Sequence, residues 1–425
     1  MIKQAFKKGQ LYVNYLGPSS SLLGNLIATP ILILNLGLNE WSLFALVNIF
    51  LPLVYLVLFG SGEFVKRLMI NIFLGNEKTK KSINMFYKYE KINFIRFIVA
   101  IVFLSFALIL FNSNNYPSYK TIELSFVFVA IAVLIKIFEF YYSELLNGLK
   151  QHYKLHMCAF IITLSKWGTI IYLSFIIDIN INTLLLTVIF FSFIMLIIQR
   201  IFILSFFKKK QNQLSNQNQS QFSEFNEKNF GTIVFLILLL QQFYNVLAFG
   251  ILDPISLSYF GIAFMISTAL PLIISPIIVY LTPEIYEKIE VNSKSRKKSF
   301  AKLLVAQFIV LIIPLVLVNI YLEQILFMWL GKTIDSFKVS SYLIPLSISA
   351  LSISLFNSLK IFFIAENKIT FMKKPLLLIF FLFFFLTISV YLKILNAEIY
   401  LYCWSISIFF LMLYFCFMFF IKKYI

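Results

Sequence analysis

Charged side chains inside long apolar segments are the residues of this sequence best suited to chemistry. Lys136 and Glu139 lie near the middle of one apolar segment, and Lys166 lies near the middle of the next. A charge at the centre of a membrane-spanning helix costs roughly 2.5–3.5 kcal/mol on insertion scales, so each of these residues needs a partner or a function. Lys136 and Glu139 share a helix face because they are three positions apart, so Glu139 neutralises one lysine and leaves a net positive charge.

Two interpretations of these three residues are open. In the first, Glu139 bridges both lysines and only ties two helices together. In the second, Lys136 and Lys166 form a cationic patch in a cavity that accepts an anionic headgroup.

Amide side chains form a second candidate set, near the middle of the first and seventh apolar segments. They are Asn25, Gln241, Gln242 and Asn245. Hydrogen bonds between neighbouring helices would be enough to explain amides in a membrane. Their matched depth on the segments that lead each half of the chain favours a position in a substrate cavity.

Signals for enzymatic or metal chemistry are weak. Gly331-Lys332-Thr333 resembles the end of a phosphate-binding loop but lacks the preceding glycine, because residue 326 is leucine. His152 and His156 have helical spacing but no carboxylates near them in the sequence, and the three cysteines have no metal-ligand spacing. The sequence therefore predicts a protein that is not an enzyme, without metal or cofactor.

The elements that must position these residues are membrane helices. Of 425 residues, 60% are hydrophobic and 13% are charged, whereas soluble domains carry about 25% charged residues. Apolar segments of 18 or more residues recur, which is the length needed to cross about 30 Å of hydrocarbon. We predict an all-α integral membrane protein with twelve spans: 14–36, 41–61, 93–112, 122–147, 157–177, 183–206, 231–251, 257–281, 300–321, 340–363, 375–393 and 399–421.

The distribution of basic residues predicts that both termini are cytoplasmic. Of the 36 Lys and Arg residues, only four fall in the segments assigned to the outside: Lys120, Lys332, Lys338 and Lys393. The net charge of +18 is thus explained by membrane insertion and by attraction to membrane lipids. It does not indicate nucleic acid.

A polar segment divides the chain into two halves. Residues 207–230 are rich in Gln, Asn and Ser, as is typical of a flexible linker. We therefore predict an N-terminal six-helix lobe at 1–206, a cytoplasmic linker at 207–230 and a C-terminal six-helix lobe at 231–425.

Three local segments, together with this architecture, resemble the Wzx-type O-antigen flippases of the polysaccharide transporter family. This family belongs to the multidrug/oligosaccharidyl-lipid/polysaccharide exporter superfamily and is related in fold to the multidrug and toxin extrusion (MATE) exporters. The segments are GLNEWSLFAL at 37–46, YYSELLNGLKQ at 141–151 and FMWLG at 327–331.

The resemblance implies a flippase in the bacterial inner membrane. Its substrate would be an undecaprenyl-diphosphate-linked oligosaccharide, such as an O-antigen, capsule or exopolysaccharide repeat unit, moved by alternating access and coupled to a proton or sodium ion. Lys136 and Lys166 would bind the pyrophosphate, and Glu139 would tune them or take up the coupling ion. A polysaccharide polymerase would be a partner in lipopolysaccharide or related glycan synthesis.

Two other functions remain as alternatives. An ion-coupled small-molecule or multidrug exporter of the same fold would use a carboxylate inside a membrane helix, and Glu139 meets that requirement. A membrane glycan polymerase would need a long outside loop with catalytic residues, which the short outside segments do not supply.

Overall fold

The structure is a computed structural model of the whole chain. It describes residues 2–50, 119–149, 151–177, 180–211, 227–244, 251–289, 293–331, 334–365 and 369–421, together with isolated positions between 65 and 98. Most of the predicted spans 41–61 and 93–112, and most of the predicted linker 207–230, lie outside the described residues.

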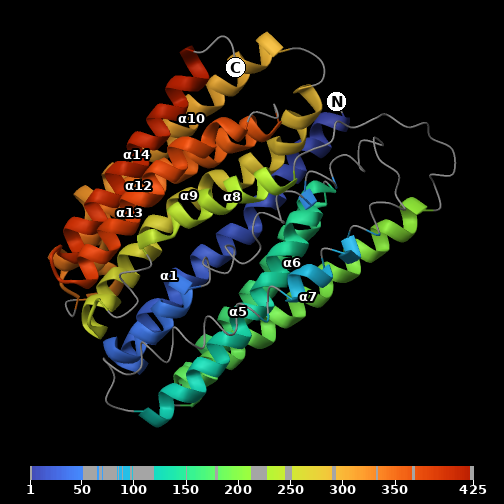
Figure 1. The fold of residues 1–425 in the computed structure, drawn as a ribbon. Helices are drawn as coiled ribbons and strands as arrows, with labels where there is room; N and C mark the ends of the chain where they lie inside the picture. Colours follow the sequence, from blue (N-terminus) through green and yellow to red (C-terminus); the bar gives the residue numbers. More distant parts are fainter. Residues whose placement is uncertain are drawn as a thin grey trace. The chain divides into compact units, whose positions relative to one another are not determined.

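The described residues form helices and the short connections between them, as predicted (Figure 1). The helices are α1 (Ile2–Phe50), α5 (Tyr119–Gly148), α6 (His152–Ile176), α7 (Ile181–Gln211), α8 (Glu227–Gln241), α9 (Pro254–Ile289), α10 (Ser293–Ile320), α11 (Leu322–Leu330), α12 (Ser336–Ala365), the short 3₁₀ helix η4 (Ile369–Met372), α13 (Lys373–Tyr391) and α14 (Ala397–Ile421).

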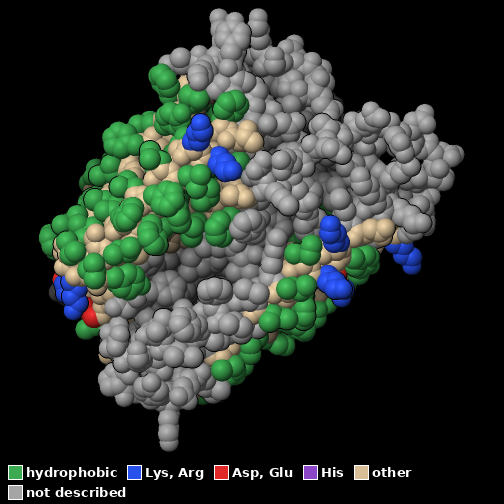
Figure 2. Space-filling model, in the orientation of Figure 1, with side chains coloured by type: hydrophobic (Ala, Val, Ile, Leu, Met, Phe, Trp, Pro, Cys, Tyr) green, Lys and Arg blue, Asp and Glu red, His purple; other side chains and the backbone are tan. Residues whose placement is uncertain are grey.

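Seven of these helices are long and apolar enough to cross a membrane within the described part of the chain. They contain Tyr15–Ser42, Tyr153–Ile176, Ile181–Lys208, Phe300–Ile320, Ser336–Phe363, Thr370–Tyr391 and Ala397–Phe419. Figure 2 shows that hydrophobic side chains cover most of the described surface on the face in view, with few charged ones among them. A soluble protein would not tolerate so much exposed apolar surface, and a multi-pass membrane protein requires it.

The chain forms two compact units. The first contains Met1–Leu36 and Phe50–Phe235, and the second contains Gly37–Ile49 and Leu236–Ile425. The stretch 37–49, which the sequence placed in the N-terminal lobe, thus groups with the second unit. The boundary between the two units within α1 falls at Gly37. Its φ of 71° lies in the left-handed region, which favours glycine.

Contacts with α9 explain why the end of α1 belongs to the second unit. The Ser258 hydroxyl donates a hydrogen bond of 2.6 Å to the Leu38 carbonyl. Gly261 lies so close to Ala45 that a Cβ on the glycine would be 2.5 Å from the Ala45 Cβ. Trp41 is completely buried. The GLNEWSLFAL segment is therefore a packing motif in the second unit.

The cap of α9 lies just before this contact. The Ser256 backbone N–H and hydroxyl both donate to the Asp253 carboxylate, at 2.9 and 2.8 Å. Burial alone would raise the pKa of the Asp253 carboxyl, but these hydrogen bonds outweigh it and hold the pKa below its usual value. Asp253 therefore satisfies donors that the first turn of a helix leaves unpaired.

In the second unit α12 is the central helix, since it packs against α9, α10 and α14. Of the residues in its most apolar stretch, 72% are buried, compared with 11% for α6. Its Ser354 and Ser358 hydrogen-bond with Gln307 of α10 at 2.9 and 2.8 Å. These bonds satisfy polar groups in a region where an unpaired one would be costly.

In the first unit α5 packs against α6 and α7. Parallel contacts also join α1 to α6 along their length. Gly17 lies against His156, Gly24 lies against Trp167, and the Asn35 side chain donates to the Ser174 carbonyl at 3.3 Å. Two helices that cross a membrane in the same direction, as the predicted first and fifth spans do, would make such parallel contacts.

Candidate functional site

The three charged residues singled out in the sequence form one cluster in the first unit. The Lys136 ammonium lies 2.6 Å from the Glu139 carboxylate, and both side chains are on α5. Lys166, on α6, is close enough to interact electrostatically with both. The side chains of Lys136 and Glu139 are 31% and 19% exposed, so the pair is accessible rather than sealed in the interior.

Lys166 is held by an aromatic neighbour. Its ammonium lies over the Trp167 ring at 4.6 Å from the ring centroid, a cation–π contact. The cluster contains two ammonium groups and one carboxylate, and the carboxylate of Glu139 is hydrogen-bonded to Lys136. One positive charge, that of Lys166, is therefore left without a carboxylate partner of its own in the cluster.

A glycine in α1 makes room for the aromatic residue. A Cβ added to Gly24 would lie 1.9 Å from the Trp167 ring, so only glycine fits at this position without a shift. Asn25, the candidate amide of the first helix, follows Gly24 directly and is half-buried. Three helices of the first unit, α1, α5 and α6, thus supply the four candidate residues of this half.

The candidate amides of the seventh segment belong to the second unit. Gln241 is buried, and its amide donates to the side-chain oxygen of Asn357 on α12 at 3.2 Å. Gln242 accepts from the Tyr244 hydroxyl at 3.4 Å. Asn245 lies outside the described residues. The bond to Asn357 is the helix-to-helix contact that amides make in membranes.

Only part of the predicted span 231–251 is described, and in it the α-helix α8 ends at Gln241. Its final carbonyl groups have no partner within the helix, and side chains of α14 bind two carbonyls at this end. Trp404 donates to the Leu240 carbonyl at 2.9 Å, and Tyr400 donates to the Phe243 carbonyl at 3.0 Å. The break is therefore stabilised by specific donors.

The YYSELLNGLKQ segment also makes structural contacts. The Tyr141 hydroxyl donates to the Phe86 carbonyl at 3.2 Å, and Glu144 forms a 3.0 Å ion pair with Lys66. A Cβ on Gly148 would lie 2.5 Å from the Lys66 carbonyl oxygen. These contacts join the end of α5 to two segments before it in the chain, which explains the spacing of polar and small residues there.

Two polar residues of α12 were not singled out as candidates from the sequence. Asn357 binds Gln241, and Lys360 is only 6% exposed. Among the described residues, no group of three or more His, Cys, Asp and Glu side chains is arranged to hold a metal ion. Cys158, Cys403 and Cys416 are free thiols.

Comparisons with known proteins identify the fold. No protein-family model matches the sequence, and no curated protein matches it. The structure is similar to MATE in the straight conformation, with a TM-score of 0.61 and 12% identity over 96% of this chain and 93% of that chain. It is also similar to the lipid II flippase MurJ in an inward closed conformation, with a TM-score of 0.59 and 14% identity over 98% and 87%.

A third solved chain, which carries only the name protein A, has a TM-score of 0.64 and 13% identity over 98% of this chain and 95% of its own. Identities this low show a shared fold and leave the substrate open. One of these structures is named as a MATE protein and another as a lipid II flippase. The chain is therefore a multi-pass membrane protein with the all-helical fold shared by MATE and the lipid II flippase MurJ.

Proposed function

We propose that the protein is a flippase that moves an undecaprenyl-diphosphate-linked oligosaccharide from the cytoplasmic to the outer leaflet of a bacterial inner membrane by alternating access. Two lobes of six helices joined by a flexible linker, both ends cytoplasmic, would form the transport path. The fold shared with a lipid II flippase supports a lipid-linked substrate.

The observation that carries this proposal is the Lys136–Glu139–Lys166 cluster. A pyrophosphate brings at least two negative charges, and hydrocarbon gives them no compensating partners. Two ammonium groups with one carboxylate leave positive charge for such a group inside the apolar helices. The excess positive charge of the cluster would not stabilise a neutral drug-like substrate.

The candidate amides extend the same binding role. Asn25 in the first unit and Gln241, Gln242 and Asn245 in the second would hydrogen-bond the sugars, which carry donors and acceptors at every hydroxyl. Gln241 would do so by exchanging its bond to Asn357. Glu139 would tune the lysines or take up the coupling proton or sodium ion. A polysaccharide polymerase would receive the exported repeat unit.

One other function has a specific observation in its favour. The similarity to MATE is as strong as the similarity to MurJ, and Glu139 is a carboxylate within a membrane helix. An ion-coupled small-molecule exporter therefore stands as the second candidate.

Deletion of the gene, followed by complementation, tests the proposal. We expect the lipid-linked oligosaccharide to accumulate on the cytoplasmic face in the deletion strain, and wild type but not Lys136→Gln/Lys166→Gln to restore export. Lys154→Gln is the matched control, because Lys154 lies on the same helix as Lys166 but contacts Phe202 instead of the cluster.

The alternatives predict different results. Normal surface glycan after deletion, together with increased sensitivity to small molecules, would show that the protein is a small-molecule exporter and not a flippase. Full export by the double variant at normal protein level would remove the two lysines from the mechanism.

A further inference from the structure

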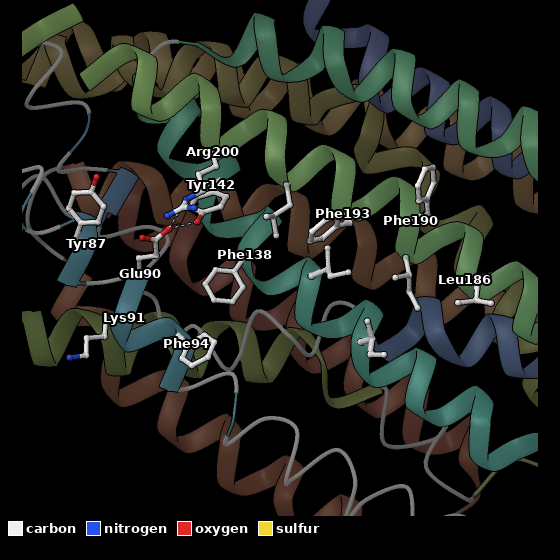
Figure 3. A pocket seen from close by; sticks show the side chains of 14 residues that line it. Tyr87, Glu90, Lys91, Phe94, Phe138, Tyr142, Leu186, Phe190, Phe193 and Arg200 are labelled. Atoms are coloured by element: carbon white, nitrogen blue, oxygen red, sulfur yellow. Dashed lines mark hydrogen bonds and ion pairs between the residues drawn. The ribbon is translucent and has the colours of Figure 1, made fainter. Parts of the chain in front are cut away.

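A long groove runs along the first unit, apart from the charged cluster. Its walls are one face of α5, where Ile131, Ile135 and Phe138 recur at helical spacing, and one face of α7, which includes Leu186 and Phe190 (Figure 3). The groove encloses about 1000 Å³. That volume is at the upper end of the roughly 300–1,000 Å³ typical of ligand sites.

The groove is apolar along its length and open. Phe190 and Phe193 are 59% and 52% exposed, although they line the groove. All the charged residues that line it lie toward one end, where Glu90 contacts Arg200 and Tyr142, and Lys91 lies nearby (Figure 3). The occupant that fits is an amphipathic molecule with one long apolar chain and one polar head.

The charged end suits an anion. The Tyr142 hydroxyl donates to the Glu90 carboxylate, and the Arg200 Nε lies 3.3 Å from the same carboxylate. Glu90 thus fixes Arg200 through one of its five N–H donors, while 49% of the Arg200 side chain stays exposed. With Lys91 also exposed, two cations and one carboxylate leave a net positive end that complements a phosphate.

The length of the groove identifies the class of chain. Leu186 and Arg200, at its two ends, are separated by about 21 Å of helix at a rise of 1.5 Å per residue. One leaflet accounts for only about 15 Å of a hydrocarbon core of roughly 30 Å. A chain that fills the groove must therefore pass the middle of the bilayer, which suits a long isoprenoid better than a phospholipid acyl chain.

The predicted orientation places Lys91 just before the predicted span 93–112 and Arg200 in the cytoplasmic half of the predicted span 183–206, on the side where basic residues concentrate. A lipid-linked oligosaccharide waiting to be moved has its head on that side. We propose that this groove is a loading site that binds the polyprenyl chain of the substrate, with Arg200 and Lys91 beside its phosphate. The inference rests on the proposed function, because it takes the substrate class from there.

Binding to the purified full-length protein tests the inference directly. Native mass spectrometry would compare undecaprenyl phosphate with phosphatidylglycerol as probes. We expect undecaprenyl phosphate to bind wild type preferentially, and Ile135→Trp, which fills the groove, and Arg200→Gln to weaken its binding by about tenfold each. Arg200→Lys should retain most of the binding.

Matched controls separate the groove from general effects. Ile161→Trp makes the same change at an exposed apolar position of α6, a residue that does not line the groove, and should bind like wild type. Equal binding of phosphatidylglycerol would overturn the inference, since an ordinary phospholipid would then occupy the groove. Unchanged affinity in both Ile135→Trp and Arg200→Gln would also overturn it.

The two proposals can fail separately. If the deletion strain exports its glycan normally while undecaprenyl phosphate still binds in the groove, the proposed function fails and the binding site stands. If deletion blocks export but Ile135→Trp and Arg200→Gln bind the probe and export like wild type, the groove is not a loading site and the flippase stands.

Discussion

At the scale of single residues, Lys166 distinguishes a binding role from a purely structural one. The ion pair of 2.6 Å joins Lys136 to Glu139 and leaves Lys166 on the Trp167 ring. If the cluster only tied helices together, loss of Lys166 would remove a cation–π contact of about 0.5–2 kcal/mol and spare transport. If the cluster binds a pyrophosphate, the same change removes its excess positive charge.

We therefore expect Lys166→Met to abolish most glycan export in the complemented deletion strain while protein level and thermal stability remain close to wild type. Lys166→Arg, which keeps the charge and stacks on Trp167, should restore export. Export by Lys166→Met at the wild-type level would show that the excess charge has no part in transport. Quantification of surface glycan, normalised to the amount of protein in the membrane, is the measurement.

Sequence reasoning found this cluster because a charge in an apolar segment is rare and costly. The charged end of the groove was not found, since Glu90, Lys91 and Arg200 lie near predicted span ends where charges are expected. Asn357 was not predicted for a related reason. Several serines precede it in α12, so one more polar residue does not stand out in the sequence.

At the scale of elements, the end of α8 is the clearest departure from expectation. Hydropathy alone does not distinguish a continuous helix from one that ends and is followed by a turn, because both keep apolar side chains at the same depth. What permits the break is the pair of donors on α14, Trp404 and Tyr400, both completely buried. Such long-range partners, about 160 residues away, cannot be assigned from one sequence.

Removing these donors should destabilise the second unit. Tyr400→Phe leaves the Phe243 carbonyl without its donor, and a buried polar group left in this way costs about 1–3 kcal/mol. Tyr414→Phe is the matched control, because it makes the same change on the same helix at a residue that is 44% exposed. Thermal unfolding of the purified variants measures the effect. Equal midpoints for the two variants would show that the bond to Phe243 does not hold this turn in place.

At the scale of the whole molecule, the all-helical fold follows from the sequence because lipid leaves the backbone few choices. Every N–H and C=O in hydrocarbon must be paired within the protein, so long apolar segments become helices. The helix α11 was not predicted because its nine residues are far fewer than the roughly 20 that a membrane span requires. Similarly, the grouping of 37–49 with the second unit depends on Ser258 and Gly261, which lie far away in the sequence.

Orientation is the whole-molecule property on which both proposals depend, and α13 offers a direct test. Phe371 precedes this helix and is 51% exposed, and Ile394 follows it and is 75% exposed. The distribution of basic residues predicts that Phe371 is cytoplasmic and Ile394 external. In a variant whose three native cysteines are replaced, we expect an impermeant thiol reagent added to intact spheroplasts to label Ile394→Cys and not Phe371→Cys.

Disruption of the spheroplasts should make Phe371→Cys reactive, which controls for access. The reverse pattern would place the charged end of the groove on the outer face. Arg200 and Lys91 would then meet lipid heads after translocation, so the groove would release a product instead of loading a substrate. Labelling of both positions from outside would mean that α13 does not cross the membrane, and the predicted twelve-span topology would be wrong at this point.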